Sequence, residues 1–195
     1  MDEKMITMIS KNERKLLLAK WLKILLNIHL LNIVCSLITA IPGIDSFAGL
    51  ITIAVSAAAA YVLFRLSEAC ERYRKAAIFQ IIAVVGTLLN QSVLALLISI
   101  CSIVGMYHEY CAHGEVTADC APELSGKWHS LFNIQLIVGI ISAFVSSAGV
   151  VIGVLAQMDT AVLVGTVVLV LALISLGLNI MYLVYLNQTQ KEFMD

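Results

Sequence analysis

The sequence contains very little charge. Charged residues make up 13% of its 195 residues, whereas soluble globular domains carry about 25%. Apolar residues make up 61% of the chain, and it contains only two prolines. These values exclude an ordinary soluble domain and predict an integral membrane protein with the lipid bilayer as its surroundings. The net charge of −1 gives no support for a nucleic-acid partner.

Sequence signatures of catalysis are also missing. The chain has no HExxH, no GxSxG, no glycine-rich phosphate loop and no pair of aspartates within an apolar run. Its five cysteines include no CxxC motif, so a thioredoxin-like thiol relay is not expected. We therefore expect a protein that is not an enzyme and that needs no cofactor.

Long uncharged runs are abundant. They cover residues 24–41, 47–64, 76–106, 130–158 and 161–186. Each run reaches the roughly 18 residues that indicate a transmembrane helix. The alternation of polar and apolar residues that is typical of barrel strands is absent. The sequence thus predicts an all-α integral membrane helical bundle with five transmembrane helices, forming a single transmembrane domain over residues 1–195.

Lysine and arginine are distributed unevenly between the runs. Six precede the first run, four lie within residues 65–75, and only Lys127 lies between the third and fourth runs. Because cytoplasmic segments are enriched in these residues, we expect the N-terminus in the cytoplasm, with a basic helix over residues 1–20. The same rule predicts that residues 107–129 form an extracytoplasmic loop. Five spans then place the C-terminus outside a plasma membrane.

The third run has Asn90 and Gln91 at its centre. One helix over residues 76–106 would be about 46 Å long and would have to tilt in the bilayer. We favour this single helix because neither a proline nor a glycine pair marks a break. The alternative is four spans plus a re-entrant or broken helix. Two full spans would need about 40 residues, more than this run provides.

A few polar side chains fall within the predicted spans. They are Asn27, His29, Asn32, Asn90, Gln91 and Asn179. Such groups either form hydrogen bonds between helices or line a path for a small solute. His29 is the ionisable one, and no carboxylate lies in any predicted span, so a proton relay is not expected.

The predicted outer loop contains two cysteines, Cys111 and Cys120. In an oxidising compartment the leading interpretation is a disulfide between them. The alternative is a zinc site formed by His108, Cys111, His113 and Cys120, which offer the nitrogen and sulfur ligands that zinc prefers but match no zinc motif. The two interpretations exclude each other because they use the same thiols.

The fourth run carries small residues at four-residue spacing. They are Gly139, Ala143 and Ser147, followed by Gly149 and Gly153. Such spacing lets two helices approach closely, either within one subunit or between copies. We therefore expect a partner-binding or oligomer-forming subunit of a membrane assembly, with a homo-oligomer or another membrane protein as partner. The alternative function is a small-solute transporter or channel with an Asn/Gln/His-lined path, whereas an intramembrane enzyme finds no supporting motif.

Overall fold

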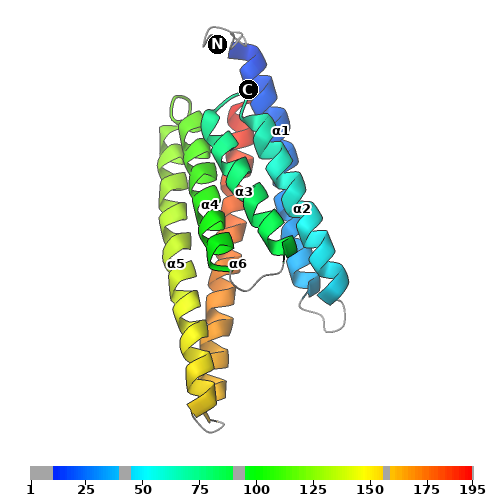
Figure 1. Ribbon diagram of the computed structural model, residues 1–195. Coiled ribbons are helices and arrows are strands. Elements are labelled where there is room, and N and C mark those ends of the chain that lie inside the picture. Colours follow the sequence, from blue (N-terminus) through cyan, green and yellow to red (C-terminus); the bar gives the residue numbers. More distant parts are fainter. Residues whose placement is uncertain (1–10, 40–44, 90–94, 156–158, 195) are drawn as a thin grey trace.

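The chain forms an all-helical bundle, shown as a computed structural model in Figure 1. The structure describes residues 11–39, 45–89, 95–155 and 159–194. Six helices occupy these ranges: α1 (Lys11–Thr39), α2 (Asp45–Leu66), α3 (Glu71–Leu89), α4 (Ala95–Thr117), α5 (Pro122–Leu155) and α6 (Asp159–Glu192).

Consecutive helices alternate in direction and pack against each other around a ring (Figure 1). Contacts between α1 and α6 close the ring, and α4 also contacts α6 across it. With six alternating helices, the start of α1 and the end of α6 lie at the same end of the bundle. Five helices would have placed them at opposite ends, as the sequence analysis expected.

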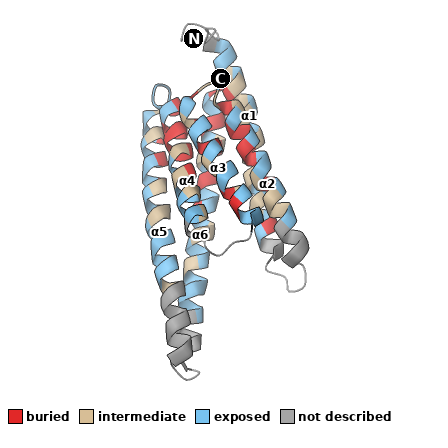
Figure 2. Ribbon diagram, viewed as in Figure 1, coloured by how far each residue is buried: buried red, intermediate tan, exposed pale blue. Residues whose placement is uncertain are grey.

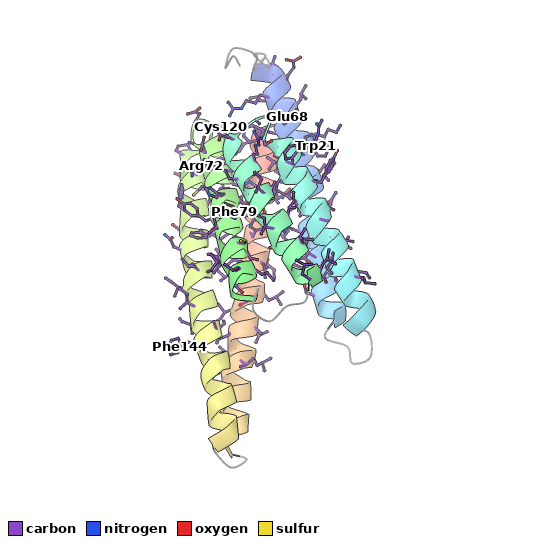
Figure 3. The ribbon with its side chains drawn as sticks, in the orientation of Figure 1. Trp21, Glu68, Arg72, Phe79, Cys120 and Phe144 are labelled. Atoms are coloured by element: carbon purple, nitrogen blue, oxygen red, sulfur yellow. The ribbon has the colours of Figure 1, made fainter. Side chains whose placement is uncertain are left out.

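One end of the bundle holds the basic side chains, and we call it the basic end. It contains the start of α1, the end of α6 and the connections 67–70 and 118–121. Every lysine and arginine in the described residues lies in the half of its helix nearer to this end. Figure 3 shows Glu68, Arg72 and Cys120 there.

Within the described residues, three helices contain segments long and apolar enough to cross a membrane. These segments are Asn12–Ser36, Pro122–Val145 and Gly165–Glu192. Large apolar side chains cover the outside of the bundle, and Phe144, 77% exposed, points away from it (Figure 3). Such a surface is stable in lipid and unfavourable in water. The protein is therefore a membrane-embedded helical bundle, although the five predicted spans are not the arrangement of its helices.

Residues 76–106 do not form the single helix that we favoured. α3 ends at Leu89 and α4 begins at Ala95, while Asn90 and Gln91 lie outside the described residues. The two helices form an antiparallel hairpin, in which Gly86 packs against Ile98. Small residues at such positions let two helix backbones approach closely.

Both helices extend beyond the uncharged residues 76–106. α3 starts at Glu71 and α4 continues to Thr117, so the helices have 19 and 23 residues. Each is close to the 20 or so residues that one crossing requires. Residues 107–117, which we assigned to a loop, are helical, and the connection to α5 is only residues 118–121.

The predicted separation of residues 65–75 from residues 107–129 is also wrong. Arg72 Nε donates to Glu115 Oε2 at 2.6 Å, which joins the start of α3 to the last turns of α4. Both connections therefore lie at the basic end rather than on opposite sides of the bundle. The loop prediction failed because it treated the polar residues of this segment as solvated, whereas several are buried between helices.

Buried residues gather in the half of the bundle nearer to the basic end (Figure 2). Its largest fully buried side chains include Trp128, Tyr73, Leu22, Leu63 and Leu186, which come from five different helices. This core holds α1 and α6 against the α3–α4 hairpin and therefore fixes the positions of the polar groups described next.

The α3–α4 hairpin predicts a disulfide between engineered cysteines. A Cβ built on Gly86 lies 3.9 Å from Cβ of Ile98, within the range of about 3.5–4.5 Å found in disulfides. After replacement of the five native cysteines by serine, Gly86→Cys with Ile98→Cys should cross-link on oxidation, as detected by mass spectrometry of linked peptides. Gly126→Cys with Ile98→Cys is the unlinked control. In one continuous helix positions 86 and 98 would lie about 18 Å apart, so no link would form.

Candidate functional site

A buried carboxylate lies at the centre of the core. Glu109 of α4 is 7% exposed, and Tyr182 of α6 donates its hydroxyl proton to Glu109 Oε1 at 2.5 Å. Nε2 of His29 on α1 lies 3.4 Å from the same oxygen. A carboxylate away from water requires such partners, because burial without them costs several kcal/mol. The side chain thus connects three helices that are distant in sequence.

A second histidine extends this group. His113 is fully buried one turn after Glu109, and its Nε2 lies 3.8 Å from Glu109 Oε1 and 3.4 Å from Tyr182 Oη. Its Nδ1 lies 2.8 Å from the hydroxyl of Tyr73 on α3. When Tyr73 donates to Nδ1, the N–H of the neutral ring is on Nε2 and faces the carboxylate. We call these five residues, His29, Tyr73, Glu109, His113 and Tyr182, the Glu109 cluster.

Aromatic side chains enclose the cluster. Trp128 stacks on His113 with ring centroids 4.4 Å apart, and Trp128 Nε1 donates to Thr189 Oγ1 at 3.0 Å. Tyr110 contacts both Trp128 and Tyr182, and its hydroxyl donates to Gln135 Oε1. These rings keep water away from the polar groups and fix the orientation of the imidazole.

A cleft leads to the carboxylate from the other side. Its volume is about 250 Å³, and it lies between α2, α3 and α4. Its polar lining consists of Thr52, Ser56, Gln80, Thr87, Ser102 and Glu109. Because Thr87 belongs to the last turn of α3, the cleft extends from Glu109 away from the basic end.

The cluster extends from Glu109 in the opposite direction. Tyr73 belongs to the first turn of α3, and His113 lies between it and the carboxylate. Glu109 lies eight residues before the end of α4, or about 12 Å from the basic end along the helix axis. The carboxylate therefore has a polar cleft on one side and a hydrogen-bonded His–Tyr pair on the other.

Of the described polar residues that were predicted to share a path, His29 alone belongs to the cluster. Asn27 and Asn179 are exposed, and Asn179 donates to the Ser175 carbonyl of its own helix at 3.0 Å. Asn32 is half-buried and accepts from Ser36 Oγ through its backbone carbonyl. Asn90 and Gln91 lie outside the described residues.

The cysteine predictions are wrong. Cys111 and Cys120 are both free, because Cys111 is buried within α4 whereas Cys120 lies in the turn that follows it. The alternative zinc site is not formed either. Within the described residues no group of three or more His, Cys, Asp or Glu side chains is arranged to hold a metal ion. His108 instead stacks on Phe79.

The small residues that were predicted to pack against another helix lie in the half of α5 that is farther from the basic end. Gly139 and Ala143 are exposed, and a Cβ built on Gly139 would meet nothing within 4 Å. Ser147, Gly149 and Gly153 belong to the same helix, but their surroundings lie outside what the structure describes. Within the described residues, Gly139 therefore forms no close helix crossing.

Sequence reasoning missed Glu109, and it named His113 only as a ligand of the alternative zinc site, because it assigned both residues to a solvated loop. A signal was present, since residues four apart on a helix lie on one face and Glu109-x3-His113 has this spacing. Extending the third run by three turns would have placed this carboxylate within a long apolar helix. The expectation that no carboxylate accompanies His29 is thus corrected.

Comparison with known proteins does not assign a function. No protein-family model, no curated protein and no solved structure matches the chain. The side chains of the Glu109 cluster nevertheless limit the chemistry that the site can perform. A carboxylate beside two imidazoles can hold a proton and pass it on, and the adjoining cleft can admit a small polar molecule.

Removal of the Tyr182 hydroxyl tests the hydrogen bond to Glu109. We expect Tyr182→Phe to lower the free energy of unfolding by about 1–3 kcal/mol, because a buried carboxylate loses a donor. The measurement is denaturant-induced unfolding in mixed micelles. Tyr185→Phe, the same change on the same helix outside the cluster, should stay within about 0.5 kcal/mol of the unmodified protein. Equal losses in both variants would contradict the assigned contact.

Proposed function

We propose that the protein is a proton-linked transporter of a small polar solute. The observation that carries this proposal is that the polar cleft ends on Glu109, whose carboxylate contacts two histidines and a tyrosine. Ionisable groups within membrane proteins are costly and generally serve ion or substrate pathways. The proposal involves no covalent chemistry and retains the expectation that the protein is not an enzyme.

In this proposal all six helices cross a plasma membrane with the basic end in the cytoplasm. The connections 40–44, 90–94 and 156–158 contain no lysine or arginine, whereas the opposite end of the bundle holds the basic residues. This asymmetry is the one that the positive-inside rule describes. Both termini are then cytoplasmic, which revises the outward C-terminus expected from five spans.

The two sides of Glu109 take different roles. The cleft admits the solute from the side away from the basic end, while the His113–Tyr73 pair leads towards the cytoplasm. Protonation removes the charge of Glu109 and weakens its attraction for His29 and Tyr182, which hold α1 and α6 against α4. Proton binding can thereby change the packing of these three helices and couple to solute movement.

A partner-binding or oligomer-forming subunit is the second candidate. It is favoured by the exposed Gly139 on α5, where an added Cβ would meet no described residue within 4 Å. A small residue on an exposed membrane helix face permits close approach of another helix. This candidate requires no solute-dependent proton movement, so the transport measurement below separates the two.

Cysteine labelling tests the proposed orientation. Cys120 is exposed, so a membrane-impermeant maleimide should label it in inside-out vesicles but not in intact cells. Cys70 is the internal control, because its side chain is buried and is not accessible to the reagent. In a Cys120→Ser background, Glu68→Cys should be labelled from the same side. Labelling of the two positions from opposite sides would contradict the shared basic end.

Reconstitution in liposomes tests transport. With the membrane potential held at zero by valinomycin and equal potassium, a transmembrane gradient of one of methylguanidinium, methylurea, glycerol or gluconate, directed outward for a solute that exchanges for the proton, should drive proton uptake that is reported by an internal pH dye. Glu109→Gln should reduce this uptake to the level of protein-free liposomes, because the amide cannot accept the proton. Glu123→Gln, at an exposed position on α5, is the matched control and should retain it. Equal flux in all preparations with every probe would contradict transport.

A further inference from the structure

We propose that the cleft binds a small organic cation that carries N–H donors, and that this cation and a proton compete for Glu109. This inference rests on the proposed function and names its substrate class. Three features of the cleft support it: the chemistry of the lining oxygens, the sign of the charge and the size of the space.

The lining presents hydrogen-bond acceptors. Thr87 Oγ1 donates to the Ala83 carbonyl at 2.9 Å, and Ser102 Oγ donates to the Ile98 carbonyl at 2.9 Å. Each hydroxyl proton is thus used on the residue's own helix, which leaves oxygen lone pairs for a ligand. A molecule that brings several donors is therefore better matched to these oxygens than one that brings acceptors.

The charge of the cleft is negative. Among the described residues that line it, Glu109 is the only ionisable side chain, and none of them is a lysine, an arginine or a histidine. The contacts found for the carboxylate in the described residues are on Oε1, from Tyr182, His29 and His113. Oε2 remains for a ligand in the cleft. In a medium of low dielectric constant a carboxylate attracts a cation strongly and repels an anion.

The space fits a small cation with a short alkyl part. A volume of about 250 Å³ lies below the usual 300–1,000 Å³ of pockets for drug-sized ligands. Ile53, Val84 and Met106 supply apolar walls beside the polar lining. A compact ammonium or guanidinium group on a short chain would place its charge at Glu109 and its carbons against these walls.

Competition follows from the single carboxylate. A protonated Glu109 is neutral and cannot pair with a cation, so binding of the cation requires loss of the proton. Affinity should fall as the pH is lowered, by about tenfold per unit once Glu109 is mostly protonated. One monovalent cation then replaces one proton, and the exchange conserves charge at the site.

Other titratable groups surround Glu109 and would respond to the same change. They are His29 from α1, Tyr73 from α3, Tyr110 and His113 from α4, and Tyr182 from α6. The histidines lie on the cluster side, and none of these groups lines the cleft. The two histidines can take up some of the protons that Glu109 releases, whereas the tyrosine hydroxyls are already protonated. The linkage must therefore be measured together with a variant at position 109.

A matched pair of probes tests the charge requirement. Methylguanidinium stays protonated over the whole working pH range, and methylurea is its neutral counterpart of similar shape. Binding to the purified protein in detergent is measured by isothermal titration calorimetry in two buffers of different ionisation enthalpy, which also counts released protons. We expect methylguanidinium to bind with release of about one proton at a pH where Glu109 is protonated, and methylurea to bind at least tenfold more weakly.

Three variants locate the binding. Glu109→Gln should weaken methylguanidinium binding more than tenfold and abolish proton release. Ser102→Ala should weaken it about three- to tenfold through loss of one acceptor. Ser130→Ala is the matched control, because Ser130 is also exposed and donates to the carbonyl four residues earlier, yet lies outside the cleft. If Glu109→Gln does not fold, the comparison of Ser102→Ala with Ser130→Ala still tests the location of the binding site.

Each outcome decides one of the two proposals. Equal binding of methylurea, proton release that persists in Glu109→Gln, or identical effects of the two serine variants would overturn the cation inference. Proton-linked flux of glycerol, methylurea or gluconate in liposomes, without methylguanidinium flux, would overturn it and leave transport standing. Methylguanidinium binding with proton release, but no solute-dependent flux with any probe, would support the cation site and overturn transport.

Discussion

The pairing of a buried carboxylate with groups from other helices is the interaction on which the rest of the structure depends. Glu109 contacts Tyr182 and His29, so one side chain joins α4 to α6 and α1. His113 adds Tyr73 and brings in α3. Each contact compensates for the cost of removing polar groups from water. Without them residues 107–117 would be too polar to continue α4 through the core.

The pairing also makes the two ends of the bundle different. Near the basic end the core is rich in aromatic rings and hydrogen bonds between side chains, with Trp128 packed on His113. Away from it the polar cleft opens between α2, α3 and α4. The outside of the bundle is apolar, as a lipid-facing surface requires. Glu109 is thus accessible through the cleft from one direction. In the other direction it is connected to His113 and Tyr73.

Hydropathy was sufficient to predict the class of fold. The first, second, fourth and fifth apolar runs correspond to α1, α2, α5 and α6, and the all-helical membrane bundle is confirmed. The sequence also singled out His29. Its basic segments, residues 11–23 and 65–75, do lie at one end of the bundle.

The hairpin and the cluster could not be found in the same way, because hydropathy scores each residue as if it were alone. Glu109 and His113 count as polar in the sequence, but in the structure they satisfy one another and their neighbours inside the core. The length of the third run was therefore underestimated, and its two helices were read as one. Which distant side chains complete such a pairing, here His29 and Tyr182, depends on the packing of helices far apart in sequence.

The protonation of Glu109 is the central claim, and infrared difference spectroscopy in lipid nanodiscs measures it most directly. As the pH is lowered, the account predicts a carboxylic-acid C=O band that is absent in Glu109→Gln. The pH midpoint of this band should shift in His29→Ala, because the imidazole contacts the carboxylate. A spectrum without such a band at any pH at which the protein stays folded, or a midpoint that is the same in His29→Ala, would contradict it.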